Sequence, residues 1–301
     1  MHIWGIVTPI TMEKQQKLIL VTGGAGFVGS HLCERLVRDG HRVISLDNYF
    51  MGSRENHVAG VEYREGHTKD IRTLVPETPE LIYHLGEYSR VAASLKEPEV
   101  VFDLNMAGTF AVLEYWREKK CKLVYAGSST KKVDAREDGV VGRNLAPYTW
   151  MKAANTELVV NYAVWYELPY AIVYFYNVYG PRERTLEEYG TVIETWRRRM
   201  IERKPLQVRA PGTQVRAFTH VIDTVDGIIL VGEKGTGDDF GIGIDEEFSL
   251  LEVAGMFGGE VEMLPATQST RATAAVDSSK VRELGWVPQH HLSDYIRECT
   301  K

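Results

Sequence analysis

Residues 17–29 read KLILVTGGAGFVG. The first six form a short apolar run with high β propensity, which predicts a strand that ends at the glycines. Residues 30–39 then show the apolar spacing of a helix, and Gly40 ends it. Residues 42–46 predict a second strand, which ends at Asp47. Strand, turn, helix and strand in this order are typical of a parallel sheet.

The same alternation continues along the chain. Further strands are predicted at residues 61–64, 81–85, 122–126 and 170–175, with long helices at 100–118 and 147–166. We therefore expect an α/β fold, a doubly wound parallel sheet of the Rossmann type.

The pattern changes after residue 180, where glycine and proline interrupt shorter elements. The predicted dinucleotide-binding domain covers residues 17–180, and segments near 213–245 return to its sheet. Residues 181–212 and 246–301 are expected to form a smaller C-terminal lobe that binds substrate. Expected elements in these parts are a helix at 191–203, a strand at 218–221 and a helix at 224–231. Residues 1–16 precede the first strand and are interpreted as an N-terminal extension.

Composition excludes several classes of protein. A net charge of -6 and a pI near 5.9 argue against nucleic-acid binding. The three cysteines (Cys33, Cys121, Cys299) are far apart, so neither a metal site nor a disulfide framework is expected, and a cytoplasmic location is favoured. The sequence contains no stretch of membrane-spanning length, and residues 1–16 lack the features of a signal peptide.

The glycines of the first turn predict a phosphate site. Gly23, Gly26 and Gly29 leave backbone N–H groups accessible to a pyrophosphate, and the following helix adds its N-terminal dipole. Asp47, at the end of the next strand, can accept both hydroxyls of a ribose and would repel a 2′-phosphate. NAD is therefore favoured over NADP. The alternative is that Asp47 and Asn48 only form a turn.

Tyr148 and Lys152 are four residues apart in a predicted helix, so they share one face. A phenol has a pKa near 10, and a nearby ammonium lowers that value. Tyr148 is thus a candidate base that takes a proton from a substrate hydroxyl. Ser128, just after the predicted strand at 122–126, is placed to bond the same hydroxyl. Surface packing alone is the alternative reading of the Tyr–Lys pair.

Together these motifs resemble the extended short-chain dehydrogenase/reductase family, and among its members the nucleotide-sugar epimerases and dehydratases of the UDP-glucose 4-epimerase type. The resemblance covers residues 17–294. It rests on VTGGAGFVG (21–29), LDN (46–48), YHLG (83–86), Asn105 with Gly108 and Thr109, PY (147–148) with Lys152, YNVYGP (176–181), RAFTHV (216–221) and LGWVP (284–288).

The resemblance implies a set of site residues. Those expected to bind NAD are Gly23, Gly26, Phe27, Val28, Asp47, Asn48, His67, Thr68, Leu85, Gly86, Asn105, Tyr148, Lys152 and Tyr176. Those expected to bind a nucleotide-diphosphate sugar are Glu87, Ser129, Asn177, Arg216 and Arg271. The two arginines would hold the diphosphate, although a surface ion pair is the alternative for each. His67 stands where the family has a carboxylate that accepts from adenine, so it either accepts instead or leaves a backbone contact. A homodimer through the helices at 100–118 and 148–166 is also implied.

Two departures from the family pattern bear on the reaction. The family's dehydratases and decarboxylases carry an acid where Ser129 and Thr130 stand, and a hydroxyl is a poor replacement. The favoured reaction is therefore epimerisation at sugar C4 through a 4-keto intermediate. A dehydrogenase or ketoreductase is the alternative, and the intact Tyr148 and Lys152 argue against a non-enzymatic NAD sensor. Glu87 replaces a small residue and either contacts substrate or pairs with Arg90 or Lys131.

Overall fold

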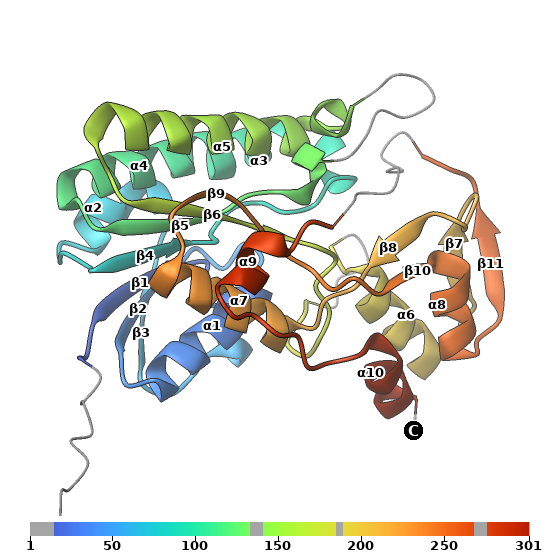
Figure 1. Ribbon diagram of the computed structural model, residues 1–301. Coiled ribbons are helices and arrows are strands. Elements are labelled where there is room, and N and C mark those ends of the chain that lie inside the picture. Colours follow the sequence, from blue (N-terminus) through green and yellow to red (C-terminus); the bar gives the residue numbers. More distant parts are fainter. Residues whose placement is uncertain (1–14, 133–140, 185–188, 268–275, 301) are drawn as a thin grey trace, which may run out of the picture.

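The computed structural model describes residues 15–132, 141–184, 189–267 and 276–300. Seven parallel strands form a central sheet in the order β3-β2-β1-β4-β5-β6-β9 (Figure 1). Their bounds are Leu18–Thr22 (β1), Arg42–Asp47 (β2), Val61–Glu65 (β3), Leu81–His84 (β4), Lys122–Ala126 (β5), Tyr170–Phe175 (β6) and Gly237–Ile242 (β9). The strand order changes direction between β1 and β4, and both neighbours pair with β1 in parallel register. The predicted doubly wound sheet is confirmed.

Helices cover both faces of this sheet (Figure 1). One face carries α1 (Phe27–Arg38), α7 (Val221–Lys234) and α9 (Ser279–Glu283), and the other carries α2 (Ile71–Leu74), α3 (Pro98–Val101), α4 (Gly108–Lys119) and α5 (Pro147–Tyr166). Strand β1 shows why both faces must be covered. Ile19 and Val21 pack into the core on one side, while Leu20 packs into the core on the other.

The helix predicted at 100–118 is interrupted. Between α3 and α4 the backbone forms a π-helix at Phe102–Ala107. This wider turn contains Asn105, whose carbonyl oxygen accepts a hydrogen bond of 2.9 Å from the Asn155 side chain on α5. Single π-turns within helices are frequently found at functional sites.

The strand predicted at 218–221 is wrong. The strand is Val215–Ala217 (β8), and α7 begins at Val221, earlier than the predicted helix at 224–231. The imidazole of His220 caps α7 by accepting from the backbone N–H of Ile222 at 3.3 Å. Phe218 is buried in the core of the lobe rather than in a strand. Apolar spacing alone does not distinguish a buried loop residue such as Phe218, or a helix cap such as His220, from the residues of a strand.

A smaller lobe lies beside the carboxyl ends of the central strands (Figure 1). It contains β7 (Leu206–Arg209), β8, β10 (Glu247–Ser249), β11 (Val261–Leu264), α6 (Val192–Ile201), α8 (Leu250–Phe257) and α10 (Leu292–Cys299). Strand β10 pairs with β8 and β11 pairs with β7. Trp196, Phe218 and Phe257 belong to a core separate from the two cores that flank the central sheet. Among the residues described, no helix is long and apolar enough to cross a membrane.

Candidate active site

A cavity of about 670 Å³ lies between the central sheet and the lobe. Its walls include the glycine turn after β1, the loop after β4, the segment after β5 and the start of α5. The opposite wall comes from α6, β7 and β8 of the lobe. In open parallel sheets, ligands bind at this point, where the strand order changes direction.

The glycine turn has the shape that a pyrophosphate requires. Gly23 has φ of 74°, and a Cβ there would lie 2.8 Å from the Cα of Gly86. A Cβ at Gly29 would collide with the carbonyl oxygen of Gly23. Gly26 stands directly before α1, and Phe27 and Val28 at the start of this helix line the cavity. Backbone N–H groups at a helix N-terminus can therefore approach an anion closely.

Asp47 forms part of the turn and also lines the cavity. Its Oδ2 accepts from the backbone N–H of Ala25 at 2.9 Å, and its Oδ1 accepts from that of Tyr49 at 2.8 Å. Burial raises the pKa of this carboxyl, and the two N–H donors oppose that rise. Since each carboxylate oxygen can accept more than one hydrogen bond, Asp47 retains capacity for ribose hydroxyls. The turn interpretation and the ribose interpretation are thus compatible.

The other predicted cofactor residues divide into two groups. Asn48, Thr68, Leu85 and Gly86 line the cavity. His67, Asn105 and Tyr176 are not among the described lining residues, and their contact with a cofactor stays a prediction. The ring of His67 lies 3.2 Å from the Asp103 carboxylate. The Asn105 amide bonds the backbone N–H and carbonyl of Tyr88, so it positions the loop after β4.

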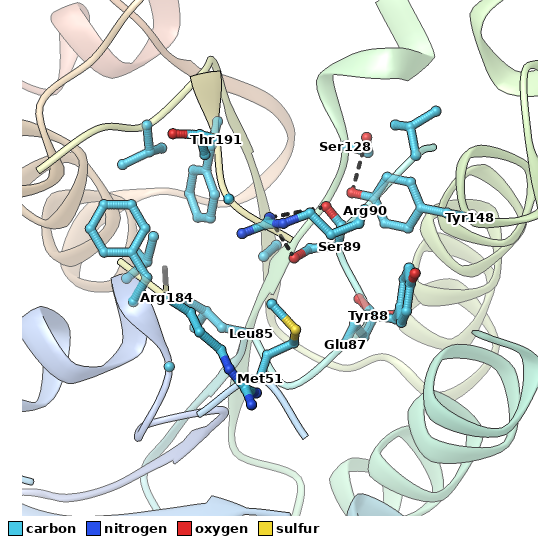
Figure 2. Close-up of a pocket in the computed structure, with 18 of the residues that line it drawn as sticks. Met51, Leu85, Glu87, Tyr88, Ser89, Arg90, Ser128, Tyr148, Arg184 and Thr191 are labelled. Atoms are coloured by element: carbon cyan, nitrogen blue, oxygen red, sulfur yellow. Dashed lines mark hydrogen bonds between the residues drawn. The ribbon is translucent and has the colours of Figure 1, made fainter. Parts of the chain in front are cut away.

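The predicted catalytic residues come together at one end of the cavity. The Tyr148 hydroxyl lies 3.5 Å from Ser128 Oγ, as the dashed line in Figure 2 shows. Ser128 Oγ is 2.7 Å from the Thr130 hydroxyl, which holds the serine in place. Pro147 is the first residue of α5. The backbone N–H of Ala146, just before the helix, donates to the Thr149 hydroxyl, so the start of this helix is well defined. Catalytic hydrogen bonds of this length shorten when substrate binds.

Lys152 lies one turn after Tyr148 but points toward the sheet. Its ammonium forms an ion pair with Glu87 and donates to the Ala126 carbonyl and, at 2.9 Å, to the Tyr125 hydroxyl. Glu87 thus pairs with Lys152 rather than with Arg90. The side chain of Lys131, the other partner considered, lies outside the described residues.

Three of the residues predicted to bind substrate, Ser129, Asn177 and Arg216, line the cavity. The Asn177 amide donates to the Ala217 carbonyl at 2.8 Å, which links β6 to the lobe. Arg216 is on β8, and Arg271 lies outside the described residues. The described lining residues therefore include one of the two arginines proposed for the diphosphate.

Sequence reasoning missed several lining residues, among them Arg90 and Arg184. Figure 2 shows Arg90 reaching into the cavity beside Ser128 and Tyr148. The Arg90 guanidinium donates to the backbone carbonyl of Tyr189 and lies 3.9 Å from the Glu183 carboxylate. Its position soon after the end of β4 was the available signal, since ligands bind at the carboxyl ends of such strands. Arg184 is not singled out by the sequence, but it lies in residues 181–212, a segment that is predicted to bind substrate.

Comparison with known proteins agrees with this geometry. A family model described as "NAD dependent epimerase/dehydratase family" matches residues 19–243. The UDP-glucose 4-epimerase of Mycolicibacterium smegmatis is 31% identical, over 94% of this chain and 97% of its own. A UDP-N-acetyl-alpha-D-glucosaminuronate decarboxylase of Bacillus cytotoxicus is 30% identical, over 79% of this chain and 78% of its own. The structure of a Thermotoga maritima UDP-glucose 4-epimerase with UDP-glucose superposes with a TM-score of 0.85 at 26% identity, covering 94% of this chain and 97% of that one.

Proposed function

The chain belongs to the NAD-dependent epimerase/dehydratase family, and on that premise we propose that it epimerises a nucleotide-diphosphate sugar at C4. NAD held in the cavity would supply reversible hydride transfer at C4, the chemistry that a 4-keto sugar and its reduction on the other face require. The glycine turn and Asp47 would hold this cofactor, and both leave room for it in the cavity. Tyr148 would take the proton of the C4 hydroxyl and give it back, while Ser128 orients that hydroxyl.

One observation supports epimerisation over elimination of water or loss of carbon dioxide. The acidic side chains among the described residues that line the cavity are Asp47 and Glu87. Asp47 lies at the glycine turn, and Glu87 is held by Lys152 and its neighbours. Neither is placed as an acid or base for sugar carbons next to C4. Ser129 and Thr130, at the family's position for such an acid, carry only hydroxyls.

Arg216 is proposed to bind the diphosphate of the substrate, together with Arg271. A guanidinium suits this task because its planar donors match two phosphate oxygens at once. Asn177 and Ser129 would contact the sugar nucleotide from the sheet side. The sequence also predicts a substrate contact for Glu87, but the contacts of its carboxylate favour a role through Lys152.

A homodimer through α4 and α5 is part of the same proposal, as is a cytoplasmic location. Large apolar side chains on these two helices are exposed, including Phe110 at 52%, Val164 at 70% and Trp165 at 60%. Exposed apolar groups gathered on neighbouring helices favour association. Sedimentation of the full chain tests this point.

The reaction is tested with the full chain and a panel of UDP-, GDP-, CDP- and dTDP-sugars. Products are separated by chromatography, and their masses are measured by mass spectrometry. Absorbance at the NADH band is followed during the reaction. We expect one sugar to give a mixture of C4 epimers of unchanged mass, with no net NADH. Tyr148→Phe is the control that should yield no product.

Other products would identify other reactions. Stoichiometric NADH formation or consumption would indicate a dehydrogenase or ketoreductase. A product lighter by water or by carbon dioxide would indicate a dehydratase or decarboxylase. Any of these outcomes rejects the epimerase proposal.

A further inference from the structure

Glu87 is a charged residue to which the proposed reaction assigns no step. It follows β4, and its side chain is 3% exposed. One carboxylate oxygen forms the ion pair with Lys152. The other accepts from Thr109 Oγ1 at 2.8 Å, Asn155 Nδ2 at 2.9 Å and Tyr125 Oη at 3.2 Å. Donors from β5, α4 and α5 therefore converge on one buried carboxylate.

A row of hydrogen bonds behind Glu87 is consistent with an ionised carboxylate. Thr22 Oγ1 accepts from the backbone N–H of Gly86 at 3.0 Å and lies 2.7 Å from His84 Nδ1. Burial lowers the pKa of His84 to about 4, so this ring is neutral. Thr22 then donates to Nδ1, and Nε2–H donates to Thr109 at 3.0 Å. The Thr109 hydroxyl in turn donates to Glu87, so the whole row points toward an ionised carboxylate.

These contacts occupy the ammonium of Lys152. Its three N–H groups have three acceptors, namely Glu87, the Tyr125 hydroxyl and the Ala126 carbonyl. The hydroxyl of Tyr148 bonds Ser128 instead. Lys152 therefore acts on Tyr148 through its charge, and a carboxylate beside Lys152 weakens that effect.

We propose that Glu87 is a positioning residue, which holds the Lys152 ammonium against β5 and offsets the positive charge that favours the ionised phenol of Tyr148. Burial by itself raises the pKa of the Glu87 carboxyl, but the charge of Lys152, with His84 and the hydrogen bonds from Lys152 and Thr109, together lower it. Glu87 is therefore ionised at neutral pH, where it pairs with the Lys152 ammonium. The reaction then proceeds beside an ion pair rather than beside a lone lysine.

Further titratable side chains face this pair or Tyr148, among them His84, Tyr125, Arg90 and Tyr88. His84 is neutral above its lowered pKa. Burial and the charge of Glu87 raise the pKa of Tyr125 well above its usual range, so it stays protonated. Arg90 faces Tyr148 from the loop after β4, and burial lowers the pKa of its guanidinium. His84 and Tyr125 keep their charge states between about pH 6 and 9, so neither causes a change in that range.

The first experiment measures the pair without using activity. Thermal unfolding is followed for the full chain, Glu87→Gln, Lys152→Met and the double variant. Each single change leaves a buried charge without its partner, so each should lower Tm by about 5 °C or more. The double variant should be more stable than the sum of the two losses predicts. If Glu87→Gln does not fold, the proposal requires that the double variant does. Additive losses, or a double variant that also fails to fold, overturn the pairing.

The second experiment rests on the proposed function and measures kcat against pH. Glu87→Gln keeps the shape of the side chain and removes its charge. Tyr148 should then become active at lower pH. The acidic limb of the pH profile, where kcat falls as pH is lowered, should therefore move down by about one pH unit. The KM for the sugar nucleotide should stay within about twofold. Glu77→Gln, which removes a carboxylate bonded to Arg64 away from the cavity, is the matched control and should leave the limb in place.

The outcomes separate this proposal from the proposed function. An acidic limb that does not move in Glu87→Gln, with kcat lowered equally at every pH, means that Glu87 has only a structural role. If no nucleotide sugar reacts, the epimerase proposal is rejected. Thermal unfolding of the single and double variants still tests whether Glu87 and Lys152 form a pair. The absorbance of ionised tyrosine adds a third measurement. Its onset should occur at lower pH in Glu87→Gln than in Glu87→Gln combined with Tyr148→Phe.

Discussion

The two walls of the cavity each bury a glutamate near a cation, but in different ways. On the sheet wall, Glu87 forms an ion pair with Lys152 and accepts three further side-chain hydrogen bonds. On the lobe side, Glu183 accepts from the backbone and hydroxyl of Thr191 and lies 3.9 Å from Arg90. The pKa of Glu87 is lowered, whereas burial raises that of Glu183 to about 7.

The difference shows that burial does not by itself decide the charge of a carboxyl group. Burial raises the pKa at both positions, and the partners then decide the outcome. A close ammonium on the sheet wall keeps Glu87 ionised. A guanidinium at a longer distance leaves Glu183 partly protonated at neutral pH. The sheet wall is therefore expected to control turnover, and the lobe wall to control stability and substrate affinity.

The largest expected effect is on the sheet wall. Tyr148→Phe keeps the ring in its buried place and removes the hydroxyl that faces Ser128. Loss of a general base lowers kcat by about 10²- to 10⁴-fold. Binding of NAD, measured by fluorescence titration, should change less than about twofold. Turnover within tenfold of the unchanged chain would contradict the assignment of the base.

A smaller effect is expected for Glu183→Gln. A folded-state pKa of about 7, raised from 4.5, means that the folded protein holds this proton longer than the unfolded chain. The stability that this provides is present below pH 4.5 and is lost as pH rises through about 7. When pH rises from 5 to 8, the unchanged chain should lose roughly 2 kcal/mol of unfolding free energy that Glu183→Gln does not lose.

Urea unfolding at both pH values measures this gain. Glu77→Gln is the control, because hydrogen bonding to Arg64 lowers the pKa of Glu77 to about 2, and this group stays ionised in that range. Equal pH dependence in Glu183→Gln and the unchanged chain would show that Glu183 ionises normally.

The smallest effect is expected for Arg216→Lys on the lobe wall. Lysine keeps the charge but loses the planar pair of donors that fits a diphosphate. Affinity for UDP, measured by calorimetry, should fall about tenfold while kcat with a saturating sugar nucleotide stays within twofold. Arg54→Lys, a change at an exposed ion pair with Glu65, is the control. A fall in kcat without a change in affinity would place Arg216 with the sheet wall instead.

Local rules of chain geometry let the sequence predict much of this protein. The positive φ of Gly23 and the crowding at Gly29 need glycine, and four-residue spacing places Tyr148 and Lys152 on one face of α5. Alternating strands and helices likewise predict a doubly wound sheet. All of these depend on residues that are close together in the chain.

Only the tertiary structure decided what surrounds these residues. Glu87 and Lys152 are 65 residues apart, and they meet because β4, β5 and α5 pack side by side. The π-helix at Phe102–Ala107 and the place of Arg90 beside Tyr148 depend on packing in the same way. No periodicity encodes a contact between distant segments, so the partner of Lys152, the proposed catalytic lysine, became visible only in the fold.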